Sequence, residues 1–196
     1  MPDLSIPHIE AMYACLVASN HETKERELVL SSPKLHAAHK RRQEILSLGG
    51  FKPLKTSWSP RSKAEEQVLN PHSYYGMVYY RKTGPRQLEL MFAHRGTCFN
   101  KMGNVLADVE ILERKAPKIL SEAVEPYVER SIQSLVAKGW EIRKVTHAGF
   151  SLGGFIAGAM AAKSDDPNVH AVTFDAPGCA YMLKSDPVRQ TVWAGH

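Results

Sequence analysis

The sequence predicts an α/β fold with a mostly parallel sheet, flanking helices and an N-terminal hairpin. From residue 73 onward, segments with strand-like alternation are separated by segments with the helical period of about 3.6 residues. The order strand–helix–strand–helix–strand makes the strands parallel, joined by right-handed crossovers. The expected elements are strands at 74–81 and 88–94, a helix at 117–138, a strand at 140–147, a helix at 152–163 and a strand at 169–174.

The length and composition fit one domain with an extension before it. The chain has 196 residues, of which 43% are hydrophobic, and this is enough for a packed core. Residues 1–70 lack the regular pattern of the later part and are expected to be a helical and irregular N-terminal extension. This extension includes a helix at 33–48 and a loop rich in Pro, Lys and Ser at 51–71. Residues 71–196 are the expected α/β core.

Turn residues divide the core into its elements. The two strands at 74–81 and 88–94 are rich in aromatic and β-branched residues, and the Lys-Thr-Gly-Pro turn between them predicts a hairpin. In the helix at 117–138, Pro126 interrupts the period, so we expect a kink or two abutting helices there. Gly139 then ends the helix.

Charge, hydropathy and cysteine content exclude several classes of function. The net charge of +5 is too diffuse to predict nucleic acid as a partner. No apolar run approaches the roughly 18 residues of a membrane span. Three cysteines without metal-ligand spacing predict neither a disulfide framework nor a metal site, and they favour a reducing, cytoplasmic location. No cofactor is expected.

One motif carries chemistry. Residues 149–153 read Gly-Phe-Ser-Leu-Gly, a G-x-S-x-G pattern between an expected strand and an expected helix. This is the setting of a nucleophile elbow, in which small neighbours let strand and helix meet closely at a strained serine. Ser151 is therefore the candidate nucleophile, and the free N–H groups of the following helix would face a developing oxyanion. The alternative is a glycine-rich turn with an idle serine.

Four blocks of the sequence, in order, resemble the class 3 (fungal-type) lipases of the α/β-hydrolase fold. They are A-H-R-G-T at 93–97, N-V-L-A-D at 104–108, G-F-S-L-G-G at 149–154 and V-T-F-D-A-P at 172–177. The likeness covers about residues 74–180.

The resemblance implies a role for several residues. Ser151 is the nucleophile, the backbone N–H of Leu152 is one oxyanion donor, and Thr97 is the other. Arg95 and Asp108 are expected to fix the loop by ion pairing or hydrogen bonds. The sequence departs from the family at Phe150, which replaces a histidine outside the triad, and at His94, which replaces an aromatic or apolar residue. We interpret His94 as a packed strand-end histidine, and we expect His147 to point into the packing of its strand.

The sequence does not decide which residues would be the acid and the base of the triad. Asp175 follows the strand after the elbow helix, where one group of lipases places its acid, but an Asp there is also typical of a turn. Asp186 is a weaker candidate with the same alternative. Only His196 follows Asp175, and a terminal residue is a poor place for a positioned base.

The last expected strand, 169–174, is apolar on both faces, as in strands interior to a parallel sheet. Its edge would be exposed, so we infer either that the family's C-terminal part is missing or that a second copy or another partner covers the edge.

No clear amphipathic lid is expected between Thr97 and Pro117. The predicted function is hydrolysis of a small-molecule or lipid ester through an acyl-enzyme. The alternative is a degenerate hydrolase that binds a ligand or a protein.

Overall fold

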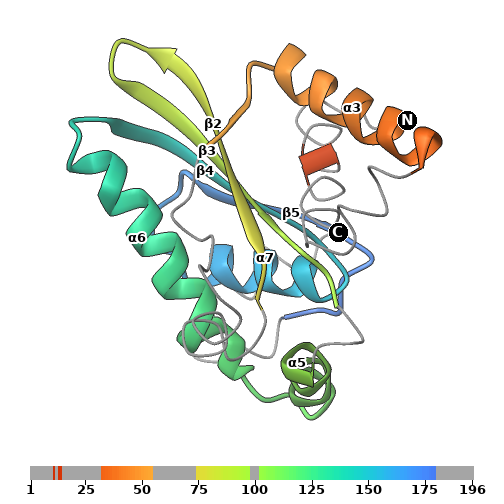
Figure 1. The fold of residues 1–196 in the computed structure, drawn as a ribbon. Helices are drawn as coiled ribbons and strands as arrows, with labels where there is room; N and C mark the ends of the chain where they lie inside the picture. Colours follow the sequence, from red (N-terminus) through yellow and green to blue (C-terminus); the bar gives the residue numbers. More distant parts are fainter. Residues whose placement is uncertain (1–10, 12, 15–31, 55–73, 98–101, 180–196) are drawn as a thin grey trace, which may run out of the picture.

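A mixed five-stranded sheet runs through the centre of the protein, with strands in the order β1-β2-β3-β4-β5 (Figure 1). The computed structural model describes residues 11, 13–14, 32–54, 74–97 and 102–179. β2 pairs antiparallel with β1 and with β3, whereas β4 pairs parallel with β3 and with β5. The sheet is therefore mixed rather than mostly parallel, because the hairpin and the short first strand make half of its pairings. The strands are β1 (Lys52–Pro53), β2 (Gly76–Gly84), β3 (Gln87–His94), β4 (Glu141–Phe150) and β5 (Val169–Phe174).

The expected hairpin is confirmed and consists of β2 and β3. Its register places Tyr80 opposite Leu90, and Gly84 opposite Gln87 leaves a two-residue loop. Pro85 restricts the first loop position, and Arg86 takes the left-handed conformation with φ of 60°. The hairpin thus closes over a short local turn.

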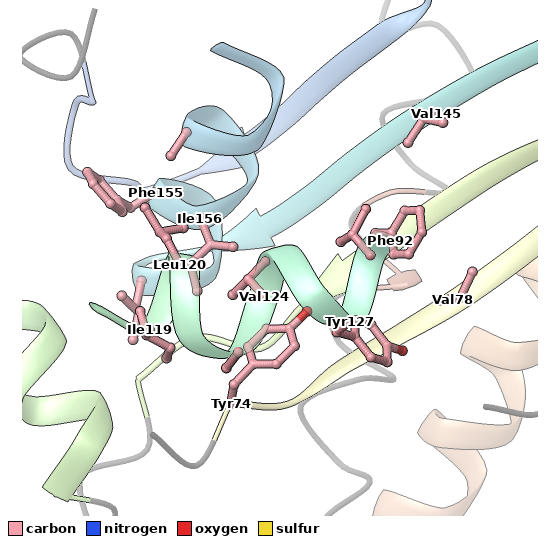
Figure 2. Close-up of a cluster of buried hydrophobic side chains, with 14 of the residues drawn as sticks. Tyr74, Val78, Phe92, Ile119, Leu120, Val124, Tyr127, Val145, Phe155 and Ile156 are labelled. Carbon is pink, nitrogen blue, oxygen red and sulfur yellow. The ribbon is translucent and has the colours of Figure 1, made fainter. Parts of the chain in front are cut away.

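Helices cover both faces of the sheet (Figure 1). On one face, α6 (Glu125–Val136) and α7 (Leu152–Lys163) pack against the larger hydrophobic cluster, part of which Figure 2 shows. On the other face, α3 (Pro33–Leu48), predicted at these bounds, adds Leu46 to a smaller cluster. The strands alternate accordingly, because Phe92 belongs to the larger cluster and its neighbour Met91 to the smaller one.

The helix expected at 117–138 is interrupted as predicted. A π-helical turn, η1 (Leu120–Val124), precedes α6, and Pro126 lies in the first turn of α6. Pro126 has no N–H to donate to the preceding turn, and the change from π-helical to α-helical bonding falls directly before it. Gly139 follows the helix with φ of 78°, and its N–H bonds to the Val136 carbonyl.

A helix that the sequence did not lead us to expect lies between Thr97 and Pro117. This is α5 (Met102–Leu112), which buries Ala107 and Ile111. Three large apolar side chains of α5 are exposed, namely Leu106, Val109 and Leu112. Because apolar side chains of α5 are both buried and exposed, the helix has no clean polar face, and the expectation of no clear amphipathic lid stays a prediction.

β5 lies at the edge of the sheet, and its residues are half-buried or exposed rather than buried on both faces. Expectations for most of the loop at 51–71, and for Asp186 and His196, fall outside the described residues. In the part of the chain that the structure describes, no helix has the length and apolar character needed to cross a membrane.

Candidate active site

Ser151 sits in a strained turn between β4 and α7. Its φ of 54° and ψ of −123° form a combination that L-residues rarely adopt. The turn is fixed on both sides, because the Ser151 N–H donates to the Phe174 carbonyl at 2.9 Å and the Phe155 N–H donates to the Ser151 carbonyl at 3.0 Å. The serine itself is half-buried. The strand–turn–helix setting expected from the G-x-S-x-G pattern is therefore present.

The glycines around Ser151 allow backbone to touch backbone. A Cβ at Gly149 would lie 1.9 Å from the Gly153 carbonyl oxygen, and one at Gly154 would lie 2.6 Å from the Cβ of Ala176. Neither position has room for a side chain, because real Cβ atoms essentially never approach closer than about 3 Å. The start of α7 thus presses directly on the end of β4.

The end of β3 and the loop after it lie against the same turn. His94 is paired with Gly149 in the parallel register. A Cβ at Gly153 would lie 2.2 Å from the His94 carbonyl oxygen, and one at Gly96 would lie 2.8 Å from the Phe150 carbonyl oxygen. The 95–97 loop therefore passes beside the residue that precedes Ser151. Thr97, the last residue of this loop, follows Gly96 directly in the sequence.

Thr97 is held by α5. Its Oγ1 donates to Oδ2 of Asp108 at 2.8 Å, so the helix and the 95–97 loop are joined at the site. Partial burial raises the pKa of the Asp108 carboxyl, and the hydrogen bond from Thr97 opposes that rise. The same loop is also held by its first residue. Arg95 is buried, its N–H donates to the Tyr75 carbonyl at 3.0 Å, and its guanidinium lies over the Tyr75 ring.

Asp175 lies next to the elbow. It follows Phe174, which is paired with Phe150 and accepts the Ser151 N–H. Asp175 is exposed, and its φ of 45° is a left-handed conformation that Asp tolerates better than most residues. Both interpretations, triad acid and turn residue, are compatible with this position.

Two histidines of adjacent strands form a buried pair that the sequence analysis did not predict. His94 Nε2 lies 3.0 Å from His147 Nδ1, and the stacked rings have centroids 5.2 Å apart. The hydroxyl of Tyr74 lies 2.8 Å from the other ring nitrogen of His94. Each residue was expected to pack in its own strand, and alternation does place both on the same face. Only the parallel register, which no local pattern encodes, brings them together.

Burial keeps this histidine pair neutral. Desolvation lowers the pKa of His147 to about 3, and desolvation followed by the neighbouring imidazole lowers the pKa of His94 well below its ordinary value. Neither ring is exposed. Other described histidines lie on α3 and at the start of β5, where His170 is at the end of the strand away from Ser151.

The arrangement provides a strained serine, a helix that begins directly after it, and a loop whose Gly96 lies against the Phe150 carbonyl. Within the described ranges, no three His, Cys, Asp or Glu side chains are grouped so as to hold a metal ion. Comparison with known proteins adds nothing to this description, because no family model, no curated protein and no solved structure matches the chain.

Proposed function

We propose that this chain is a serine hydrolase of carboxylic or lipid esters, with an α/β-hydrolase-like core similar to that of the class 3 lipases. The observation that carries the proposal is the backbone of Ser151, a non-glycine residue at φ 54° and ψ −123° between a strand and a helix. Such strain persists only where the surroundings hold it, and it is concentrated at functional sites. Here three glycines and two backbone hydrogen bonds hold it.

In the proposed reaction, Ser151 Oγ attacks the ester carbonyl carbon and loses its proton to a general base. The carbonyl oxygen becomes an oxyanion, which would be stabilised by the backbone N–H of Leu152 and by Thr97. Collapse of this intermediate breaks the bond to the alcohol, which leaves with a proton, and an acyl-enzyme remains. Water then attacks the acyl group and releases the acid and the free serine.

The exposed apolar side chains of α5 support an apolar ester as substrate. Leu106, Val109 and Leu112 lie on the helix whose Asp108 bonds to Thr97. An apolar acyl or alkyl chain entering the site from this side would remove these side chains from water, at about 25 cal/mol for each Å² buried.

A fluorophosphonate probe tests the proposal, because it labels a serine only when that serine is activated. We expect one label per chain, located at Ser151 by peptide mass spectrometry, and no label in Ser151→Ala. An unlabelled protein that is folded by circular dichroism would contradict the assignment of Ser151 as a nucleophile.

A second candidate function is a non-catalytic scaffold that binds a ligand or a protein. It is favoured by the state of the two histidines nearest the elbow, which are buried and hydrogen-bonded to one another. Neither is free to accept a proton from Ser151, and His196 lies outside the described residues. A silent probe combined with saturable binding of an ester analogue would favour this second function.

Asp175→Asn separates the two interpretations of Asp175. Asn retains the tolerance for a left-handed conformation but removes the carboxylate that would orient and stabilise a charged histidine. We expect hydrolysis of a short-chain nitrophenyl ester to fall by about 10³- to 10⁴-fold, the size typical of losing a triad acid. The midpoint of urea unfolding should be unchanged.

Asp166→Asn is the matched control, since Asp166 is an exposed aspartate in the loop before β5, where it accepts the Asn168 N–H. It should leave hydrolysis unchanged. Full activity in Asp175→Asn would assign Asp175 to the turn alone.

A further inference from the structure

A hydrogen-bonded chain of three buried side chains crosses the site end of the sheet. Tyr74, before β2, contacts His94 at the end of β3, and His94 contacts His147 in β4. Phe92 stacks on His147 with centroids 5.3 Å apart, so the chain lies inside the larger hydrophobic cluster. The proposed reaction uses none of these three groups.

The chain ends where the candidate site begins. His94 immediately precedes the 95–97 loop, and its carbonyl oxygen lies in the space that a Gly153 side chain would occupy. His147 lies two residues before Gly149, on the strand that ends at the elbow. Any displacement of this pair would move the ends of β3 and β4, and with them the backbone on both sides of the proposed oxyanion position.

In their neutral forms, the three side chains satisfy one another's hydrogen-bonding groups. A neutral imidazole has one donor and one acceptor nitrogen, and a phenol can do both, so the three groups form a continuous chain in either direction. Among the described residues, the titratable groups in contact with the pair or its ring neighbours are phenols, namely Tyr74 and, from α6, Tyr127, whose ring contacts those of Tyr74 and Phe92. The thiol of Cys179 belongs to the same cluster. α7 contributes apolar side chains to the cluster, and the nearest cation along the chain, Arg95, lies over Tyr75. No carboxylate is among these neighbours to stabilise a charged imidazole.

We propose that the Tyr74–His94–His147 chain is an acid-sensitive latch that positions the 95–97 loop beside Ser151. When both imidazoles are neutral, the chain holds together the three segments that carry Tyr74, His94 and His147. When an imidazole is protonated, the hydrogen bonds break and the segments separate. The positioning of catalytic groups rests on the proposed function, whereas the latch itself does not depend on catalysis.

The sign of the pH effect follows from the lowered pKa values of both imidazoles. The latch contributes its full stability above the ordinary histidine pKa of about 6.5, and this stability is lost as the pH falls below that value. Compared with pH 8, the opening equilibrium at pH 5 is about 30-fold more favourable when one imidazole regains its ordinary pKa in the opened state. It is about 1,000-fold more favourable when both imidazoles do so. Acid therefore shifts the equilibrium toward the open form of the site end of the sheet.

Amide hydrogen exchange of the full chain between pH 8 and pH 5, corrected for intrinsic rates, tests this. The reporters are the Arg95 N–H, bonded to Tyr75, and the Ser151 N–H, bonded to Phe174. The remote reporter is the Glu141 N–H, bonded to Arg86 at the other end of β4. We expect the opening constant at the two site reporters to rise by about 10³ and that at Glu141 to change much less.

The triple variant Tyr74→Phe, His94→Phe and His147→Phe removes all three members of the chain together, so that none of the three is left without the others, and its site reporters should lose this pH dependence. His170→Gln, at an exposed histidine of β5, is the matched control and should behave as the wild type. A flat wild-type profile, or an equal rise at Glu141, would overturn the proposal.

If the triple variant does not fold, proton NMR of the wild-type imidazoles decides. Two buried rings that stay neutral in folded protein below pH 5 support the latch, and titration near pH 6.5 overturns it. Neither measurement uses ester hydrolysis, so a silent probe at Ser151 would contradict the proposed function and leave the latch standing.

Discussion

Ser151→Ala is expected to lower kcat/KM for a short-chain nitrophenyl ester by a factor on the order of 10⁴ or more. The substitution removes the one atom that forms the acyl bond, and binding and oxyanion stabilisation alone leave only a small residual rate. Alanine keeps the Cβ and therefore the same strained backbone, so the free energy of unfolding should change little. Steady-state kinetics and urea unfolding on the same preparation measure both effects.

Ser121→Ala is a suitable control, because Ser121 is an exposed serine on η1, and its hydroxyl bonds to the carbonyl of Lys118 three residues earlier. It should retain the wild-type rate. Turnover by Ser151→Ala at the wild-type rate would remove Ser151 from the mechanism and would rule out an acyl-enzyme at this serine.

Gly149→Ala is expected to destabilise the protein by more than about 3 kcal/mol, a large share of the typical stability of a domain. The added methyl would meet the Gly153 carbonyl at 1.9 Å and the Gly154 nitrogen at 2.5 Å. These are backbone atoms at the start of α7, which can yield only if the helix moves away from the sheet. Chemical denaturation should show a much lower midpoint, with loss of soluble protein as the extreme result.

Gly178→Ala provides the contrast, since a Cβ there meets no atom of the described residues within 4 Å. Its free energy of unfolding should stay within about 0.5 kcal/mol of the wild-type value. Equal stability of Gly149→Ala and wild type would mean that α7 does not press on β4 as described, and the strained elbow would lose its cause.

The parts of the fold that the sequence predicts well are those encoded locally. The hairpin follows from two alternating segments and a Gly-Pro turn, and α3 follows from Pro33 at its start and the glycines after Leu48. The elbow is equally local, because the conformation of Ser151 is allowed by glycines within three residues of it. Structure that is determined by residues close together in the sequence can be predicted from that stretch of sequence.

Long-range features were harder to predict. β1 pairs with β2 across the undescribed residues 55–73, and this pairing contributes to the mixed character of the sheet. α5 exposes three apolar side chains and so lacks the clean polar face by which an amphipathic helix is recognised. The histidine pair depends on the register of β3 against β4, which the burial of both strands together decides.

β3 joins two kinds of pairing, and this has a consequence for how the chain folds. Its antiparallel partner is adjacent across a two-residue loop, whereas its parallel partner arrives only after α5, η1 and α6. Closing the short loop costs less chain entropy, so β2 and β3 can nucleate first and offer a template on which β4 docks later. The nascent polypeptide thus builds β3, which leads into the loop of Thr97, before β4, which leads into Ser151, and the two strands meet late along the folding pathway.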